Sequence, residues 1–310
     1  MKANTSPSLS SVLPTPMTKR RERQTLLKIL LLVLAIVIFI PVWMVITAAF
    51  SEEASISQYG FSLWPREWSL SSFRYVSRFG SQLVQSYKVT IVVTLSATAL
   101  TLLLTSMLAF SLSRHGFQLR GFITLYLLIT MIFSGGQLGS YLIYTNLFNL
   151  RNNLLVLILP GAVGAMNCFI MRSFILSNVP DAIIESAKID GASDYRIFFQ
   201  VVLPLMLPVM GAIGFMVAVG HWNEWQNAML YINKKELSTL QQLLMNIETT
   251  LDYLSEQDTV SSIQEAEMLK TLPTESGRMA LLLCALGPVL IMYPFFQKYF
   301  VKGLSLGSVK

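Results

Sequence analysis

The sequence predicts an all-α membrane protein that crosses the bilayer about six times. Of its 310 residues, 53% are apolar and only 13% are charged, whereas soluble chains carry about 25% charged residues. Six apolar runs alternate with polar segments, and each run approaches the roughly 20 residues that a helix needs to cross the hydrocarbon core. The six runs are 29–50, 89–112, 121–144, 154–174, 203–220 and 279–297.

The N-terminal segment, residues 1–24, is rich in Ser, Pro, Thr and basic residues, so we expect it to be disordered. The run 29–50 is long enough to be a transmembrane helix, with a kink at Pro41 that membrane helices tolerate. Ala48 and Ala49 near its end also fit a signal peptide. The apolar region of a signal peptide is usually about 7–15 residues long, so we expect a retained first helix.

Three later runs contain helix-breaking residues. Gly135 and Gly136 interrupt the third run, Pro160 lies in the fourth, and Pro204 and Pro208 lie in the fifth. Irregular backbone at membrane depth is tolerated only where protein or a water-filled cavity covers it. These breaks therefore suit a bundle that lines a pore, although ordinary kinks between packed helices explain each one equally well.

The distribution of basic residues predicts the orientation, because Lys and Arg gather on the cytoplasmic side of membrane proteins. The segment 19–28 has five basic residues, the turn 113–120 has two arginines, and the tail 298–310 has three lysines. With six spans, all three lie on one side, which we expect to be the cytoplasm. The connection 221–278 has four Lys or Arg against nine Asp or Glu, so we expect it to be extracytoplasmic.

A polar segment, 180–204, separates the fourth and fifth runs. Pro180 and Asp181 favour the first turn of a helix, by fixed φ and by charge at the positive end of the helix dipole. Gly191 is suited to end this helix in the left-handed conformation, and Ser193 can cap a second one. The sequence therefore predicts helix, glycine turn and helix at one end of the bundle.

The same segment resembles the cytoplasmic loop of permease subunits in bacterial binding-protein-dependent ABC importers. That family carries E-A-A-x3-G-x9-I-x-L-P, with Ser186 and Val201 as the two departures here. The resemblance implies a permease domain over 25–297, with a loop at 178–204 that couples to ATPase subunits; an interfacial helix pair without a partner is the alternative. The residues that we expect to couple are Ile184, Glu185, Ser186, Ala187, Gly191, Tyr195, Leu203 and Pro204. Of these, Ile184 and Tyr195 are expected to give apolar contacts, and Glu185 a polar one.

A second cluster lies at the outer end of the fifth run. It reads His221-Trp222-Asn223-Glu224-Trp225. One interpretation is an aromatic belt at the membrane interface. The other is the lining of a sugar path, because aromatic rings stack on sugars while amides and carboxylates bind hydroxyl groups. The resembling carbohydrate permeases have a similar Trp-Asn stretch here, so these five residues are our candidates for the substrate path.

Gln137 completes the candidate path. It ends F-S-G-G-Q at 133–137, which looks like the signature of ABC ATPase domains. No P-loop G-x-x-x-x-G-K-[ST] occurs in the sequence, so we expect no ATP hydrolysis by this chain alone. Residues 133–137 instead interrupt an apolar run, and in the resembling permeases this place commonly reads G-G before a short stretch that leads into Y-L, as in Tyr141-Leu142 here. We therefore expect Gln137 to be a cavity or packing residue.

The remaining chemistry argues against an enzyme. The two histidines, His115 and His221, lie near opposite ends of the predicted bundle and cannot form a paired-ligand metal site. We therefore expect no catalytic residue, no metal and no cofactor. The positive charge is divided by topology, so it does not indicate nucleic-acid binding.

The tail 297–310 is similar to the ends of maltose-type and Gram-positive polysaccharide permeases. The resemblance implies a bacterial plasma-membrane permease for a sugar or oligosaccharide. Its expected partners are a second homologous permease, an ABC ATPase dimer, an extracytoplasmic solute-binding protein or lipoprotein, and membrane lipid. A permease for a peptide, an amino acid or an ion, a membrane signalling or scaffold protein, and a membrane enzyme are the alternatives.

Overall fold

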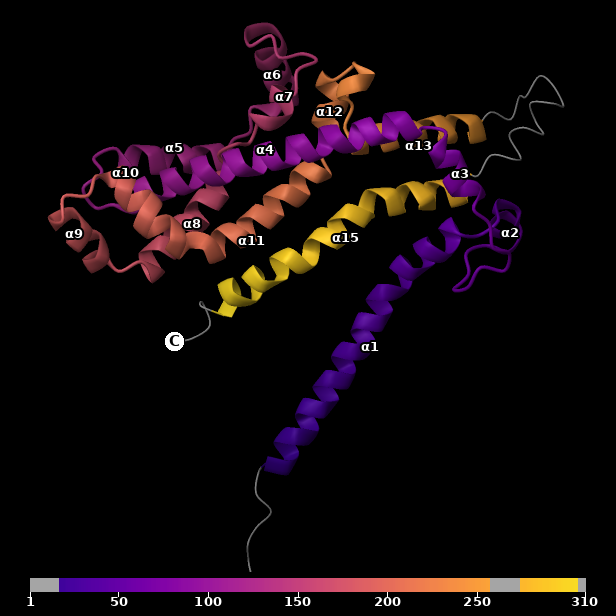
Figure 1. Cartoon of the computed structure of the whole chain (residues 1–310), viewed down its shortest axis with the longest axis horizontal. Coiled ribbons are helices and arrows are strands. Elements are labelled where there is room, and N and C mark those ends of the chain that lie inside the picture. Colours follow the sequence, from indigo (N-terminus) through magenta and orange to yellow (C-terminus); the bar gives the residue numbers. More distant parts are fainter. Residues whose placement is uncertain (1–16, 257–273, 306–310) are drawn as a thin grey trace, which may run out of the picture.

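The computed structural model describes residues 17–256 and 274–305, and the regular elements in these residues are helices. The predicted all-α membrane fold is confirmed. The longest helix, α4 (Gly80–Ser113), forms the spine of the bundle. It packs against α8 (Ala165–Asn178) and α11 (Leu203–Trp222), and α11 in turn packs against α15 (Glu275–Ser305). Figure 1 shows α4 running across the whole bundle, with α11 and α15 below it.

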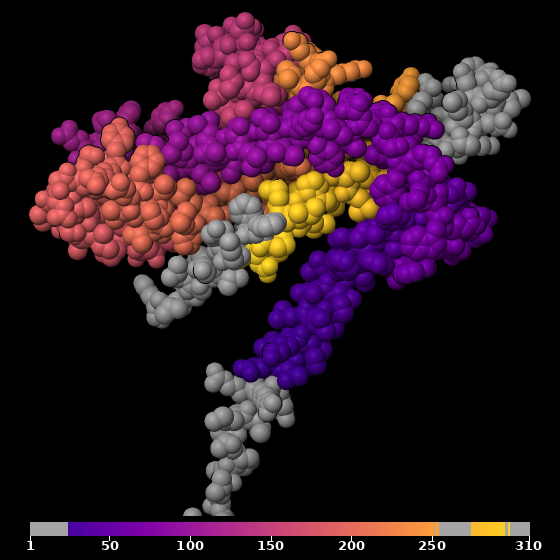
Figure 2. Space-filling view, in the orientation of Figure 1, coloured from indigo at the N-terminus to yellow at the C-terminus, as the bar shows by residue number. Residues whose placement is uncertain are grey.

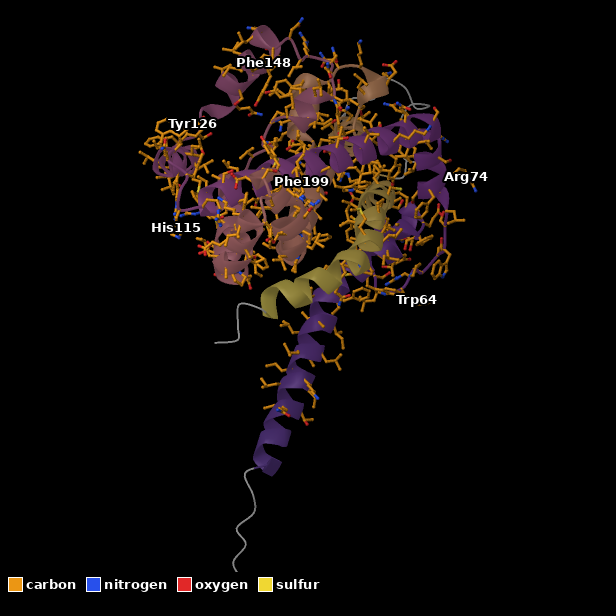
Figure 3. All side chains as sticks on the ribbon, turned by 60° about the vertical axis from the view of Figure 1, so that its left-hand side comes forward. Trp64, Arg74, His115, Tyr126, Phe148 and Phe199 are labelled. Atoms are coloured by element: carbon orange, nitrogen blue, oxygen red, sulfur yellow. The ribbon has the colours of Figure 1, made fainter. Side chains whose placement is uncertain are left out.

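The connecting segments lie at two opposite ends of this bundle (Figure 1). At one end are the short helices α9 (Asp181–Ile189) and α10 (Asp194–Ile197). At the other end are α2 (Glu53–Tyr59), α3 (Ser71–Ser77) and α13 (Leu240–Glu256). Figure 3 shows His115 at the first end, with Trp64 and Arg74 at the second.

The third apolar run breaks where the sequence predicts it. Helix α5 (Arg120–Ile132) and the pair α6 (Gly136–Leu142) and η1 (Ile143–Leu147) meet at an angle of 116°. Gly136 begins α6 with φ of +74°, a left-handed conformation that glycine adopts without steric cost. The chain thereby turns out of the bundle.

Helices α6, α7 (Leu155–Ile158) and α12 (Gln226–Tyr231) form a unit that protrudes from the side of α4 (Figures 1 and 2). Three tyrosine rings pack together in this unit. Tyr231 stacks on Tyr141, with ring centroids 5.7 Å apart, and is nearly perpendicular to Tyr144, with ring centroids 6.0 Å apart. Figure 3 shows Phe148 far out on this unit.

Within the described residues, four helices are long and apolar enough to cross a membrane, or five if the bent α5–α6 pair counts as one span. The difference from the predicted six lies in the run 154–174. Its first part is α7, its second part begins α8, and the two are separated at Pro160–Gly164, where Gly161 has φ of +75°. A proline followed by a left-handed glycine ends a helix, so this run is not one continuous span.

The first helix, α1, runs from Met17 to Ala49 and therefore includes the basic residues expected to precede it. Its apolar side chains from Leu26 to Ile40 are exposed, whereas Thr47 and Ala49 near its C-terminal end are buried, and Ala49 packs in one cluster with residues of α3 and α15. Figure 1 shows α1 leaving the bundle at this end. The last helix likewise continues to Ser305, so residues 298–305 of the predicted tail are helical.

One long-range contact fixes the start of α15. The Glu53 carboxylate of α2 accepts hydrogen bonds from the backbone N–H groups of Glu275 and Ser276, both at 2.9 Å. It also accepts from the hydroxyl groups of Thr274 at 2.8 Å and Ser276 at 2.6 Å. Glu53 thus caps the N-terminus of the last helix, where backbone N–H groups have no partner within the helix.

Candidate functional site

The loop 180–204 folds into two short helices joined by a glycine turn, as the sequence predicts, and one face of the loop packs against the helix bundle. Helix α9 begins after Pro180, and Asp181 in its first turn lies 3.4 Å from the guanidinium of Arg114 at the end of α4. Ile184 is 1% exposed and packs in the same apolar cluster as Ile197. The buried face of α9 therefore fixes the loop to its own bundle.

The turn between the two helices is a Schellman motif. The N–H of Ala192 donates to the carbonyl of Ala187 and the N–H of Gly191 donates to that of Lys188, both at 3.0 Å. Gly191 has φ of +78°, as this motif requires of the residue after the helix. No atom lies within 4 Å of a Cβ built at Gly191, so only its backbone conformation demands glycine.

The second helix is capped at one end and continuous with a span at the other. The Ser193 hydroxyl accepts from the backbone N–H of Arg196 at 3.4 Å, which is the cap that the sequence predicts. Helix α10 then passes without a break through η2 (Phe198–Val202), a π-helical turn, into α11. Phe198 is buried against Phe110 of α4, with ring centroids 5.6 Å apart. Helix α10 is therefore continuous with a helix that is long and apolar enough to cross a membrane.

The surface of the loop that faces away from the bundle carries exposed side chains that a partner protein could contact. Tyr195 is 71% exposed, Ile189 is 86% exposed, and Glu185 is also exposed. Ile184 faces inward, and Ile189, which the sequence analysis did not single out, takes the outward apolar position. Of the other candidate coupling residues, Ser186, Gly191 and Pro204 are exposed, and Ala187 and Leu203 are half-buried.

The outer cluster at 221–225 is not one continuous wall. Trp222 is 3% exposed, its indole N–H donates to the carbonyl of Ala285 at 3.0 Å, and its ring lies 6.3 Å from that of Tyr87. This indole joins α11, α15 and α4 inside the core, so Trp222 does not line an open path. The sequence could not distinguish the two roles because a core indole and a lining indole have the same neighbours in the chain.

Two other residues of the cluster at 221–225 also form hydrogen bonds within the chain. The Glu224 carboxylate accepts from the backbone N–H of Asn227 at 2.9 Å, and the Asn223 carboxamide accepts from Gln241 at 3.2 Å. Trp225 lines a small cavity of about 120 Å³ between α13 and α15. His221 is half-buried on α11, whereas Gln137 is exposed on α6 in the protruding unit.

Replacing Trp222 by Phe should destabilise the bundle. The change removes the hydrogen bond from the indole to the Ala285 carbonyl and part of a buried ring, and the lost hydrogen bond alone costs about 0.5–1.5 kcal/mol. The thermal midpoint of the purified protein in detergent should fall. Trp225→Phe, at an indole that is 39% exposed, is the matched control and should change the midpoint little. Equal midpoints for both variants would contradict the buried role of Trp222.

A larger cavity at the same end has no counterpart in the sequence predictions. It measures about 340 Å³ and lies between α3, the start of α4, α13 and the segment 232–238. Tyr75, Lys234 and Lys235 are among its lining residues. The sequence offers only a weak signal for it, the pair of lysines between two apolar helices.

Comparison with known proteins identifies the family. Residues 122–306 match the family described as "Binding-protein-dependent transport system inner membrane component". The chain belongs to this family. The match includes α9, Gly191 and the π-helical connection into α11, and it confirms the resemblance drawn from the motif at 185–204.

Individual relatives extend the match over nearly the whole permease. The polygalacturonan/rhamnogalacturonan transport system permease protein YtcP of Bacillus subtilis is 36% identical over 286 residues, covering 90% of this chain and 95% of that protein. The arabinooligosaccharides transport system permease protein AraQ of the same organism is 26% identical over 291 residues, covering 92% and 95%. Family membership makes this chain a multi-pass plasma-membrane permease subunit and not itself an enzyme.

A solved structure has the same fold. It is a crystal structure of a bacterial ABC transporter involved in the import of the acidic polysaccharide alginate. One of its chains matches with a TM-score of 0.74 and 24% sequence identity, covering 93% of this chain and 100% of that chain. The likeness extends over nearly the whole chain and shows a shared fold.

Proposed function

We propose that this permease forms half of the translocation path of an ABC importer for an oligosaccharide. The observation that carries the proposal is the match over nearly the whole chain to permeases that are named for saccharide transport. These include the polygalacturonan/rhamnogalacturonan, arabinooligosaccharide and galactooligosaccharide systems of Bacillus subtilis. A second, homologous permease supplies the other half of the path.

Helices α9 and α10 are the coupling element of this proposal. Glu185, Ile189 and Tyr195 present a charged group and two apolar groups on the surface of the loop, which suits a cleft on an ABC ATPase subunit. Ile184 and Phe198 hold the opposite face to the bundle. When ATP brings the two ATPase subunits together, the loop moves with its subunit, and packed helices pass such a rigid-body displacement to the spans.

The positions of the remaining partners follow from the orientation. The basic segments support a cytoplasmic position for both chain ends and for the coupling loop, beside the ATPase dimer. The opposite end of the bundle, with α2, α3 and α13, then faces outward and receives the solute-binding protein or lipoprotein. Residues 257–273, within the predicted extracytoplasmic connection 221–278, lie outside the described residues.

Purification of the tagged permease from its native membrane in mild detergent tests the proposal. We expect an ABC ATPase and a second permease to copurify, and the accompanying binding protein to bind oligosaccharides. Recovery of the permease alone, or with signalling proteins only, would contradict it. Recovery of the complete importer with a binding protein specific for amino acids would leave the assembly intact and exclude the saccharide.

Replacement of residues 257–270 by a Gly/Ser segment of equal length should reduce uptake and leave the complex with the ATPase intact. The segment follows α13 on the side where we place the binding protein, and the ion pair of Asp252 with Arg278 is outside it. Uptake into whole cells and copurification of the ATPase measure the two effects. Unchanged uptake would show that this segment does not contribute to delivery of the solute.

A further inference from the structure

The cavity of about 340 Å³ beside α3 and α13 lies apart from the coupling loop and from the cluster at 221–225. Its size is at the lower end of the roughly 300–1,000 Å³ typical of small-ligand sites. It lies at the end of the bundle that carries α3 and α13, where Figure 3 shows Arg74 on α3. A site here would meet a solute before it enters the bundle.

The backbone of the segment 232–238 is held in place on both sides. The Asn152 carboxamide oxygen accepts from the backbone N–H groups of Asn233 at 2.6 Å and Lys234 at 3.1 Å. The Gln85 side chain donates to the carbonyl of Glu236 at 2.9 Å. These bonds fix the chain at and beside the two lysines, so their stems start from defined positions.

The floor of the cavity is equally fixed. Gln242 is 7% exposed, donates to the carbonyl of Ile232 at 2.7 Å, and accepts from the Ser238 hydroxyl at 3.1 Å. The Thr90 hydroxyl of α4 accepts from the backbone N–H of Leu240 at 2.8 Å. A polar site whose walls are ordered in advance loses little entropy when a ligand binds.

Several lining groups, in contrast, have no partner inside the protein. Lys234 and Lys235 are exposed and form no ion pair with any residue in 17–256 or 274–305. The carboxamides of Gln82 and Asn246 also make no side-chain hydrogen bond in this part of the chain. The cavity therefore has two ammonium groups and two carboxamides that are free to bind a ligand.

An aromatic wall completes the site. Tyr75 and Phe79 of the α3–α4 corner both line the cavity, with ring centroids 5.7 Å apart and the rings nearly perpendicular. Aromatic faces beside amides and cations match the apolar face, the hydroxyl groups and the acid group of a sugar acid. A neutral sugar would use the ring and the amides but would leave both lysines unpaired.

We infer that this cavity binds an acidic oligosaccharide, with Lys234 and Lys235 pairing with uronate carboxylates and Tyr75 packing against a sugar ring. The inference rests on the proposed function and narrows its substrate to saccharides that carry carboxylates. The ligand is the solute itself. An acidic surface of the solute-binding protein is the competing occupant, and the experiment separates the two.

The test compares trigalacturonate with its fully methyl-esterified form, which keeps the same chain but has no charge. Binding is measured by saturation-transfer NMR on the purified permease–ATPase complex in lipid nanodiscs, without the binding protein. The free acid should bind about tenfold more tightly than the ester, because two exposed ion pairs contribute up to about 1 kcal/mol each. Raising the salt concentration should weaken binding of the acid only.

Lys234→Gln combined with Lys235→Gln should remove the preference for the acid and its salt dependence, while the ester binds as before. Lys88→Gln, at an exposed lysine of α4 outside the cavity, is the matched control and should change neither. Tyr75→Ala should weaken both ligands alike, since it removes the ring and not the charge.

Equal binding of acid and ester by the unmodified complex would overturn the inference and leave a saccharide importer in place. So would an undiminished acid preference in the double variant. If the double variant instead loses affinity only for the solute-binding protein, the lysines belong to a docking surface and the inference fails. Failure of the complex to contain an ATPase would count against the proposed function, which is a separate result.

Discussion

Gly191→Val should abolish the stimulation of ATP hydrolysis by substrate in the assembled importer while the permease still inserts into the membrane. The turn holds Gly191 at φ of +78°, and a left-handed conformation costs a residue with a side chain roughly 1–2 kcal/mol, with β-branched residues affected most. The Schellman bonds of Gly191 and Ala192 would be lost, and α10 would no longer be held at a fixed angle to α9. ATPase activity of the reconstituted complex, with and without loaded binding protein, measures the effect.

Two matched variants separate backbone strain from side-chain bulk. Gly191→Asn should retain most of the stimulation, because asparagine enters the left-handed region far more readily than valine. Gly116→Val adds the same side chain at an exposed glycine of the 113–120 turn, where no positive φ is needed and no atom lies within 4 Å. Normal stimulation in Gly191→Val would show that the turn does not transmit the ATPase motion.

Glu53→Ala should lower the stability of the folded protein more than the other substitutions considered for the outer end. Loss of a helix cap costs up to about 2 kcal/mol, and hydrogen bonds to a charged group contribute about 1.5–3 kcal/mol each. The substitution removes the acceptor of four hydrogen bonds at the start of α15. Thermal unfolding in detergent, followed by tryptophan fluorescence, measures the loss.

The contribution of Glu53 should also depend on pH. Burial by itself raises the pKa of this carboxyl, but the hydrogen bonds from Ser276, Glu275 and Thr274 outweigh burial and hold the pKa below its ordinary value of 4.5. A carboxyl whose pKa is lower in the folded state stabilises that state above 4.5, and this stabilisation is lost as the pH falls through the lowered pKa. The difference in thermal midpoint between the native protein and Glu53→Ala should therefore shrink in acid.

Glu53→Gln is the isosteric control, since it keeps one oxygen acceptor and carries no charge. Its midpoint should lie between the other two and its difference from Glu53→Ala should not vary with pH. Glu52→Ala, at the neighbouring carboxylate, removes none of the bonds at α15 and should change little. A pH-independent difference for Glu53→Ala would mean that the carboxylate charge is not what stabilises the cap.

The loop was predictable from sequence because its determinants are local. Gly191 and Ser193 fix the turn and the second helix through bonds to residues within five positions, and such signals can be recognised without a fold. The direction of Ile184 was not predictable to the same degree. Ile183 and Ile184 are adjacent and equally apolar, and only packing against Ile197 and the rest of the core decides that the second faces inward.

The features that sequence reasoning missed all depend on distant partners. The cap at α15 joins residues 222 positions apart, and the bond from Gln85 to the 232–238 segment spans 151. Trp222 is buried because α15 passes beside it, which the apolar run at 279–297 does not reveal. The lengths of the apolar runs predicted the spanning helices well, except in the run 154–174, which a proline and a left-handed glycine divide.

The two parts of α1 should accept different substitutions. Between Leu26 and Ile40 its apolar side chains are exposed, so packing within the chain restricts them little, and exchanges among Leu, Ile, Val and Phe should leave the fold of the chain unchanged. From Thr47 to Ala49 the same helix is enclosed, and the Thr47 hydroxyl donates to the carbonyl of Ser62 at 2.9 Å. There, size and hydrogen bonding restrict each position, so a single helix should combine a region of wide sequence freedom with one of almost none.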